Sequence, residues 1–189
     1  YENIGRKGSR NAIGFEWSVT DNTTLRLVKG TIAEGGIRSP FIAIGPGIAH
    51  GKRSDALLHV MDMAPTFLKI AGASHPRQYK GKDVLPIQGK SMLTILKGES
   101  KSVRSDRDTL GWELIGLKAM RIGDWKATRL APPFGESKWQ LFNMDNDPGE
   151  AKDISSEHLK KLQTLNKAYE DYDEQNGVVE IKIEFEPLN

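Results

Sequence analysis

The 189-residue sequence contains no cysteine, which excludes disulfide bonds, cysteine-ligated zinc and a thiol nucleophile from this chain. It also lacks an excess of either charge, because 27 Lys and Arg residues against 25 Asp and Glu residues leave a net charge of only +2. Nucleic-acid binding typically calls for clustered basic residues, and none are clustered here. No apolar run approaches the roughly 20 residues of a membrane-spanning helix. We therefore expect neither a nucleic-acid partner nor a membrane partner.

An initiator methionine and a signal peptide are also lacking, since the chain opens on Tyr1-Glu2-Asn3. This opening predicts a fragment or a processed chain, so the N-terminus indicates no compartment. What is present is typical of a globular protein, with 38% hydrophobic and 28% charged residues. A chain of this length forms one domain or two small ones.

The first half of the chain predicts one unit of a layered α/β domain. Residues 40–45, Pro-Phe-Ile-Ala-Ile-Gly, are typical of a strand buried on both faces of a parallel sheet. A helix is predicted over 62–72, with Asp62 as its N-cap and Gly72 at its C-terminal end. A shorter helix is predicted over 91–96. Strand followed by helix is the pattern of a layered α/β fold.

The second half predicts a small antiparallel sheet. A polar stretch at 97–108 comes first and indicates a surface linker. Four runs of strand-forming residues follow, and the two residues Gly123-Asp124 between the second and third runs predict a hairpin. The predicted strands cover residues 109–115, 118–122, 125–130 and 139–143.

A long amphipathic helix is predicted near the C-terminus, over about residues 155–176. Ser155 is its predicted N-cap, and Gly177 is placed to end it. One face carries large apolar side chains at helical spacing, namely Leu159, Leu162, Leu165, Tyr169 and Tyr172. The alternating tail at 178–185 predicts an edge strand.

These patterns together predict a mixed α+β chain with two parts. The C-terminal part of an α/β domain would cover residues 1–100, and a small subdomain would cover residues 101–189. Residues 1–24, which show no sustained period, are expected to be extended and irregular. A strand at 41–44 without sheet neighbours would expose an edge, so we expect the isolated chain to self-associate.

The run at 29–40, Lys-Gly-Thr-Ile-Ala-Glu-Gly-Gly-Ile-Arg-Ser-Pro, is the main candidate for a functional site. Its glycines allow backbone conformations that gather N–H groups into an anion-binding nest, and Lys29 adds a cation. The competing interpretation is a structural turn with a solvated lysine and a Glu34–Arg38 ion pair. The pattern alone favours the structural interpretation, because most polar clusters are structural.

Other motifs fail on their spacing. Gly89-Lys90-Ser91 lacks the glycine that a P-loop requires five positions earlier, where Val84 stands. The acidic turn at 145–150 lacks the glycine and glutamate positions of an EF-hand loop. The histidines show no metal-ligand spacing, so no metal site is predicted within this sequence.

The run at 29–40 resembles the second signature region of the formylglycine-dependent sulfatases, a family of the alkaline-phosphatase superfamily. Further segments resemble motifs of this family in the same order, and they are residues 2–6, 59–72, 89–93, 111–114, 119–126 and 139–150. The chain therefore resembles the C-terminal portion of a bacterial arylsulfatase, with the C-terminal part of the sulfatase α/β domain as its expected fold.

This resemblance implies a parent enzyme that hydrolyses sulfate esters with a formylglycine nucleophile and a calcium ion. Lys29 inherits contact with the sulfate group. The residues expected to support its loop are Gly30, Glu34, Gly35, Gly36 and Arg38. The Cys/Ser-x-Pro-x-Arg motif and the acidic calcium ligands are missing, so the resemblance places them upstream of Tyr1. We expect the isolated chain to be inactive without the missing N-terminal part of the same polypeptide.

Two alternatives stay open at this point. A phosphonate or phosphate monoester hydrolase of the same superfamily shares the scaffold and much of the site. A non-catalytic module would bind a partner through the sheet at 109–143 and the terminal helix. A Cys/Ser-x-Pro-x-Arg motif in the upstream gene sequence would indicate the sulfatase.

Overall fold

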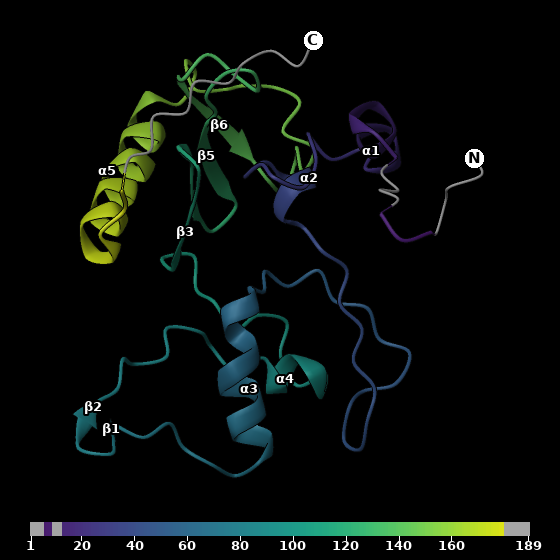
Figure 1. Cartoon of the computed structure of the whole chain (residues 1–189), viewed down its shortest axis with the longest axis vertical. Helices are drawn as coiled ribbons and strands as arrows, with labels where there is room; N and C mark the ends of the chain where they lie inside the picture. Colours follow the sequence, from purple (N-terminus) through teal and green to yellow (C-terminus); the bar gives the residue numbers. More distant parts are fainter. Residues whose placement is uncertain (1–5, 9–12, 180–189) are drawn as a thin grey trace. The chain divides into compact units, whose positions relative to one another are not determined.

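The computed structural model describes residues 6–8 and 13–179 of the chain. These residues form two compact units (Figure 1). The first unit contains the chain up to Ser39 and from Thr109 onward, and the second contains Pro40–Asp108. The boundary expected near residue 100 concerns the domains of a longer protein and stays a prediction.

A four-stranded antiparallel sheet in the order β3-β4-β5-β6 forms the centre of the first unit. Its strands are β3 (Thr109–Leu114), β4 (Leu117–Ile122), β5 (Trp125–Arg129) and β6 (Trp139–Asn143). All the predicted strands of this region are confirmed. The predicted Gly123-Asp124 hairpin is also confirmed, because Ile122 pairs with Trp125 across it.

Helix α5 (Leu159–Asn176) covers one face of this sheet. Leu165 and Tyr169 of α5 pack into an apolar cluster with three buried residues of the sheet, namely Met120, Ala127 and Leu141. Gly177 ends the helix with φ 61°, as predicted. The predicted cap at Ser155 is wrong, because Ser155 lies in a preceding turn, where its N–H donates to Asp153, and His158 is the N-cap.

The opposite face of the sheet is covered by the segment that contains the run at 29–40. Successive side chains of a strand alternate between faces, so Ala119 points away from α5. With Leu117 and Leu130 it forms a second apolar cluster around the buried Ile32. The sheet thus has a helix on one side and the candidate run on the other (Figure 1).

Helix α1 (Phe15–Asp21) lies within the segment predicted to be irregular. The expectation for residues 1–24 is therefore wrong over α1, while residues 1–5 and 9–12 lie outside the described part. The helix is short. The Ser18 hydroxyl donates to the Gly14 carbonyl within it, and the Phe15 ring lies 6.5 Å from the Phe134 ring. A hydrophobic period cannot be seen over so few residues.

The second unit contains the short elements η1 (Val60–Asp62), α3 (Met63–Ile70), β1 (Gln78–Tyr79), β2 (Lys82–Asp83) and α4 (Leu93–Leu96). Both predicted helices of this region are confirmed. Asp62 does not cap α3 through its side chain, however, because its carboxylate is engaged elsewhere. None of the described helices combines the length and the apolar character that crossing a bilayer requires.

The predicted strand at 40–45 is wrong. No strand is present there, and Ile42 and Ile44 are 90% and 89% exposed. A strand needs a neighbour for its N–H and C=O groups, and no described segment pairs with this one. The strand predicted over 178–185 lies outside the described residues from residue 180 onward.

Candidate functional site

Lys29 lies at an exposed turn ahead of the buried part of the run. The N–H and the hydroxyl of Thr31 both donate to the Val28 carbonyl oxygen, at 3.2 and 2.8 Å. Gly30 closes this turn with φ 93°, a backbone conformation that favours glycine. Lys29 itself makes no hydrogen bond or ion pair with the described residues. Its ammonium group is available to an anion from outside.

A buried ionic cluster, which we call the Lys126 triad, consists of Lys126, Glu34 and Glu150. The Lys126 Nζ lies 2.8 Å from Glu34 Oε1 and 2.8 Å from Glu150 Oε1. It also donates to the Ile32 carbonyl oxygen at 3.1 Å. The Glu34 N–H donates to Glu150 Oε2 at 2.9 Å. The triad therefore joins the run to β5 and to the turn that follows β6.

Gly35 and Gly36 allow the run to approach other backbone segments closely. A Cβ on Gly35 would lie 2.2 Å from the Leu27 carbonyl oxygen, and one on Gly36 would lie 2.2 Å from the Thr31 carbonyl oxygen. The Gly35 N–H donates to the Arg26 carbonyl at 2.9 Å. These two positions admit only glycine because the neighbouring atoms belong to the backbone.

The N–H groups around Gly35 and Gly36 are not available for an anion-binding nest. From residue 34 to residue 38 each N–H donates to an acceptor within the protein. The expected Glu34–Arg38 ion pair is replaced by the contact of Glu34 with Lys126. An anion would therefore meet side-chain cations here, and Lys29 and Arg38 are both exposed.

The chain ahead of Lys29 is held as firmly as the chain behind it. The Asn22 amide donates to the carbonyl oxygens of Leu27 and Gly35, at 2.9 and 2.6 Å. The Arg26 guanidinium donates to Gln140 Oε1 on β6 at 2.9 Å. Both sides of the Lys29 turn are therefore bonded to fixed parts of the first unit.

Arg121 adds a further positive charge close to this region. It lies on β4 and donates from Nε to the Gly123 carbonyl at 2.9 Å. Burial lowers the pKa of Arg121. The negative charges of Glu34 and Asp124 raise this pKa, and repulsion from Arg38 lowers it further. Arg38, at the end of α2 (Glu34–Ile37), thus lies close enough to Arg121 for the two positive charges to repel each other.

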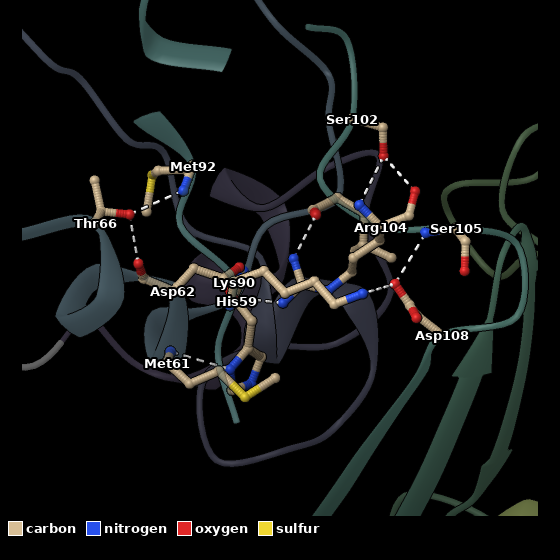
Figure 2. Close-up of polar contacts among 11 residues, drawn as sticks. His59, Met61, Asp62, Thr66, Lys90, Met92, Ser102, Arg104, Ser105 and Asp108 are labelled. Atoms are coloured by element: carbon tan, nitrogen blue, oxygen red, sulfur yellow. Dashed lines mark hydrogen bonds and ion pairs between the residues drawn. The ribbon is translucent and has the colours of Figure 1, made fainter. Parts of the chain in front are cut away.

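Asp62 is the centre of a polar network in the second unit (Figure 2). Its Oδ1 accepts from the Arg104 guanidinium at 2.6 Å and from the Lys90 N–H at 2.8 Å, and its Oδ2 accepts from the His59 N–H at 2.8 Å. Burial favours the neutral acid, but Arg104 and the two backbone donors together hold the pKa of Asp62 below its usual range. The carboxylate is therefore ionised and fully paired.

The same network joins the segments at 59–72 and 89–93. The Thr66 hydroxyl donates to the Asp62 carbonyl at 2.6 Å and accepts from the Met92 N–H at 2.9 Å. Gly89 passes so close that a Cβ there would lie 2.0 Å from the Met61 carbonyl oxygen. Figure 2 also shows Lys90 paired with Asp108. These contacts give the two segments a structural role.

His59 takes part in this network as a neutral side chain. Its Nδ1 accepts from the Met61 N–H at 3.3 Å. Burial lowers the pKa of His59, and Arg104 lowers it further, while Asp62 acts in the opposite direction. In the part of the chain that the structure describes, no three His, Asp or Glu side chains gather to hold a metal ion. The side chains at 6–8 and 13–179 therefore do not fit a calcium site.

Sequence reasoning missed Lys126 and Glu150 as partners of the run. Both lie in segments that resemble sulfatase motifs, but 92 residues separate Lys126 from Glu34, and 116 separate Glu150 from it. The one available signal was Lys126 itself. It lies in a predicted strand, and the alternation of side chains along the strand directs it to a covered face of the sheet.

No protein-family model matches the chain. It is 34% identical over 180 residues to an uncharacterised sulfatase of Schizosaccharomyces pombe, a match that covers 94% of this chain and 32% of that protein. It is 32% identical over 161 residues to a sulfatase of Formosa agariphila, covering 79% of this chain and 28% of that protein. It is 37% identical over 108 residues to an arylsulfatase of Klebsiella aerogenes, covering 56% of this chain and 23% of that protein.

The chain spans about a third, or less, of the length of these relatives. Among solved structures, it resembles the crystal structure of Ps i-CgsB with a TM-score of 0.59 and 25% identity, over 79% of this chain and 32% of that one. The mixed α+β architecture agrees with the expected C-terminal part of a sulfatase-type fold. Because the relatives include a fungal protein, the bacterial origin stays a prediction.

Proposed function

This chain belongs to the sulfatase family, and on that premise we propose that it is part of an enzyme that hydrolyses sulfate esters to an alcohol or phenol and sulfate. Lys29 is the residue of this chain that contacts the sulfate group. The observation that carries the proposal is the geometry of its turn. Lys29 is exposed and makes no polar contact with the described residues, yet both sides of its turn are bonded to a buried sheet.

The chemistry of a sulfate ester suits such a lysine. A fixed ammonium group beside a sulfate oxygen offsets the charge of the group, and its effect grows where water is partly excluded. Because the chain on both sides of Lys29 is bonded in advance, little loop freedom is lost when the substrate binds. The remaining residues of the run support this placement, and they are Gly30, Glu34, Gly35, Gly36 and Arg38.

Sulfatases normally use a calcium ion and a formylglycine. This sequence contains neither a cysteine nor a Ser-x-Pro-x-Arg motif from which a formylglycine is made. Other parts of the full-length protein are therefore proposed to supply both, and the N-terminal part of the same polypeptide is the proposed partner of this chain. The role of the present residues is to bind and orient the sulfate ester.

The test compares the full-length enzyme with its Lys29→Ala variant on an aryl sulfate. Removing one preorganised contact to developing charge typically lowers kcat by about 10²–10³, and we expect a loss in that range. Lys160→Ala, which removes an exposed lysine of α5, is the matched control and should leave turnover unchanged.

Equal turnover by the Lys29→Ala variant and the parent would contradict the role of Lys29. A parent enzyme that prefers an aryl phosphate or phosphonate to the aryl sulfate would instead indicate a phosphoesterase of the same superfamily.

A further inference from the structure

We propose that the members of the Lys126 triad are positioning residues for Lys29. The inference rests on the proposed function, because it assigns a task to residues that never touch the substrate. Lys126 is fully buried, and the side chains of Glu34 and Glu150 are 7% and 0% exposed. The triad therefore acts on the site only through the run that it holds.

Stability alone is a poor explanation for such a cluster. Taking charges out of water costs much of what their attraction returns, so well-packed apolar residues often serve a core as well or better. The face of the sheet around Lys126 already has apolar packing, with Ile32, Leu117 and Leu130 buried together. The charged groups instead fix the position of the segment that they bind, because each contact requires a defined distance and orientation.

The contacts of the triad reach the backbone of the run, and this fixes the path of the chain. Lys126 donates to the Ile32 carbonyl, and Glu150 accepts from the Glu34 N–H. A run with three glycines among its residues 30–36 has much backbone freedom to lose. Bonds at residues 32 and 34 restrain it a few positions after Lys29.

The two residues that make these bonds, Lys126 and Glu150, are themselves held in place. Lys126 lies on β5, which is paired on both sides by β4 and β6. Glu150 adopts φ 53°, a left-handed conformation that non-glycine residues rarely take. Its N–H donates to the Asp147 carbonyl at 3.2 Å. A strained glutamate whose carboxylate meets both a buried lysine and a backbone N–H is typical of a residue that holds a defined position.

The test is a double-mutant cycle between Lys29 and Glu150 in the full-length enzyme. Because a misplacement of about 1 Å can cost on the order of 10²-fold in rate, we expect Glu150→Gln to lower kcat by about 10-fold or more. In the K29A background the same substitution should change kcat by less than about 2-fold, because no lysine remains to be positioned. KM should change much less than kcat if the contact strengthens in the transition state.

Asp62→Asn is the matched control, since it also converts a buried, ion-paired carboxylate into an amide. Its effect on kcat, whatever its size, should be the same with and without Lys29. If Glu150→Gln does not fold, Glu34→Gln replaces it: the amide oxygen can still accept from Lys126, which favours folding, but the loss of charge weakens the contact, so kcat should fall in the same direction.

The outcomes separate the two proposals. Additive effects of Glu150→Gln and Lys29→Ala on kcat would overturn the positioning role, and so would an unchanged kcat in a folded Glu150→Gln or Glu34→Gln enzyme. An unchanged kcat in Lys29→Ala would instead overturn the proposed function.

Discussion

Both units of this chain bury a charged network, but the networks lie in different surroundings. In the first unit Lys126 of the triad lies on a sheet that has apolar clusters on both faces. In the second unit the Arg104–Asp62 pair joins short elements, while large apolar side chains such as Ile42, Phe67 and Leu85 are exposed. The first network therefore lies within apolar packing that can hold a loop in place, whereas the second links short elements that have little apolar packing between them.

The substitution with the largest expected effect is Lys126→Met. It leaves the two carboxylates of Glu34 and Glu150 buried without their shared cation. Breaking a buried ion pair from one side costs about 3–5 kcal/mol, and we expect a loss of unfolding free energy in that range. Urea unfolding measures it.

The corresponding substitution in the second unit, Arg104→Met, should cost less. Asp62 keeps hydrogen bonds from the N–H groups of Lys90 and His59, so its carboxylate remains partly satisfied. We expect about 1–3 kcal/mol, the usual cost of removing one partner of a buried polar group. A larger loss for Arg104→Met than for Lys126→Met would break the comparison between the two networks.

Gly36→Ala tests the close backbone approach in the run. The new Cβ would lie 2.2 Å from the Thr31 carbonyl oxygen, so the backbone must move. Overpacking of this kind costs about 1–3 kcal/mol, and thermal unfolding measures it.

Gly45→Ala is the control for this substitution in the second unit. Its Cβ would meet only the Ile48 side chain at 3.9 Å. We expect a change within about 0.5 kcal/mol of zero, as for a surface substitution. Equal losses at the two glycines would contradict the account of the run.

The pKa of Asp62 predicts a smaller, pH-dependent effect. Because this pKa is lower in the folded chain than in the unfolded chain, the ionised carboxylate stabilises the fold above the unfolded value of about 4. This stabilisation is lost as the pH falls through the folded value. The difference in unfolding free energy between the parent and Asp62→Asn should therefore shrink from pH 5 to pH 3. A constant difference would show that Asp62 does not titrate as described.

The sequence predicted those parts of the fold that depend on local pattern. The strands around Gly123-Asp124 alternate clearly, and Gly177 ends α5 with the backbone conformation that favours glycine. The strand predicted at 40–45 failed because an apolar run becomes a strand only beside a partner. The N-cap of α5 is His158 and not Ser155, because local hydrogen bonds of the preceding turn compete with capping.

The candidate site shows the same limit. Lys29 and the glycines were found because they are adjacent in sequence, whereas Lys126 and Glu150 are brought to them only by the sheet. A charge on a strand indicates its partner only once the register and the covering segment are known. The run left an anion nest and a structural turn open, and the structure shows that Gly35 and Gly36 serve close backbone packing and not an anion nest.

The central claim is that Lys29 contacts the sulfate group, and inhibition by inorganic sulfate tests it most directly. Competitive inhibition constants for sulfate are measured with the full-length enzyme and its Lys29→Ala variant, alongside their melting temperatures. A hydrogen bond to a charged group is worth about 1.5–3 kcal/mol, so the inhibition constant should rise by about 10-fold or more while the melting temperature stays the same. An unchanged inhibition constant in the folded variant would contradict the account.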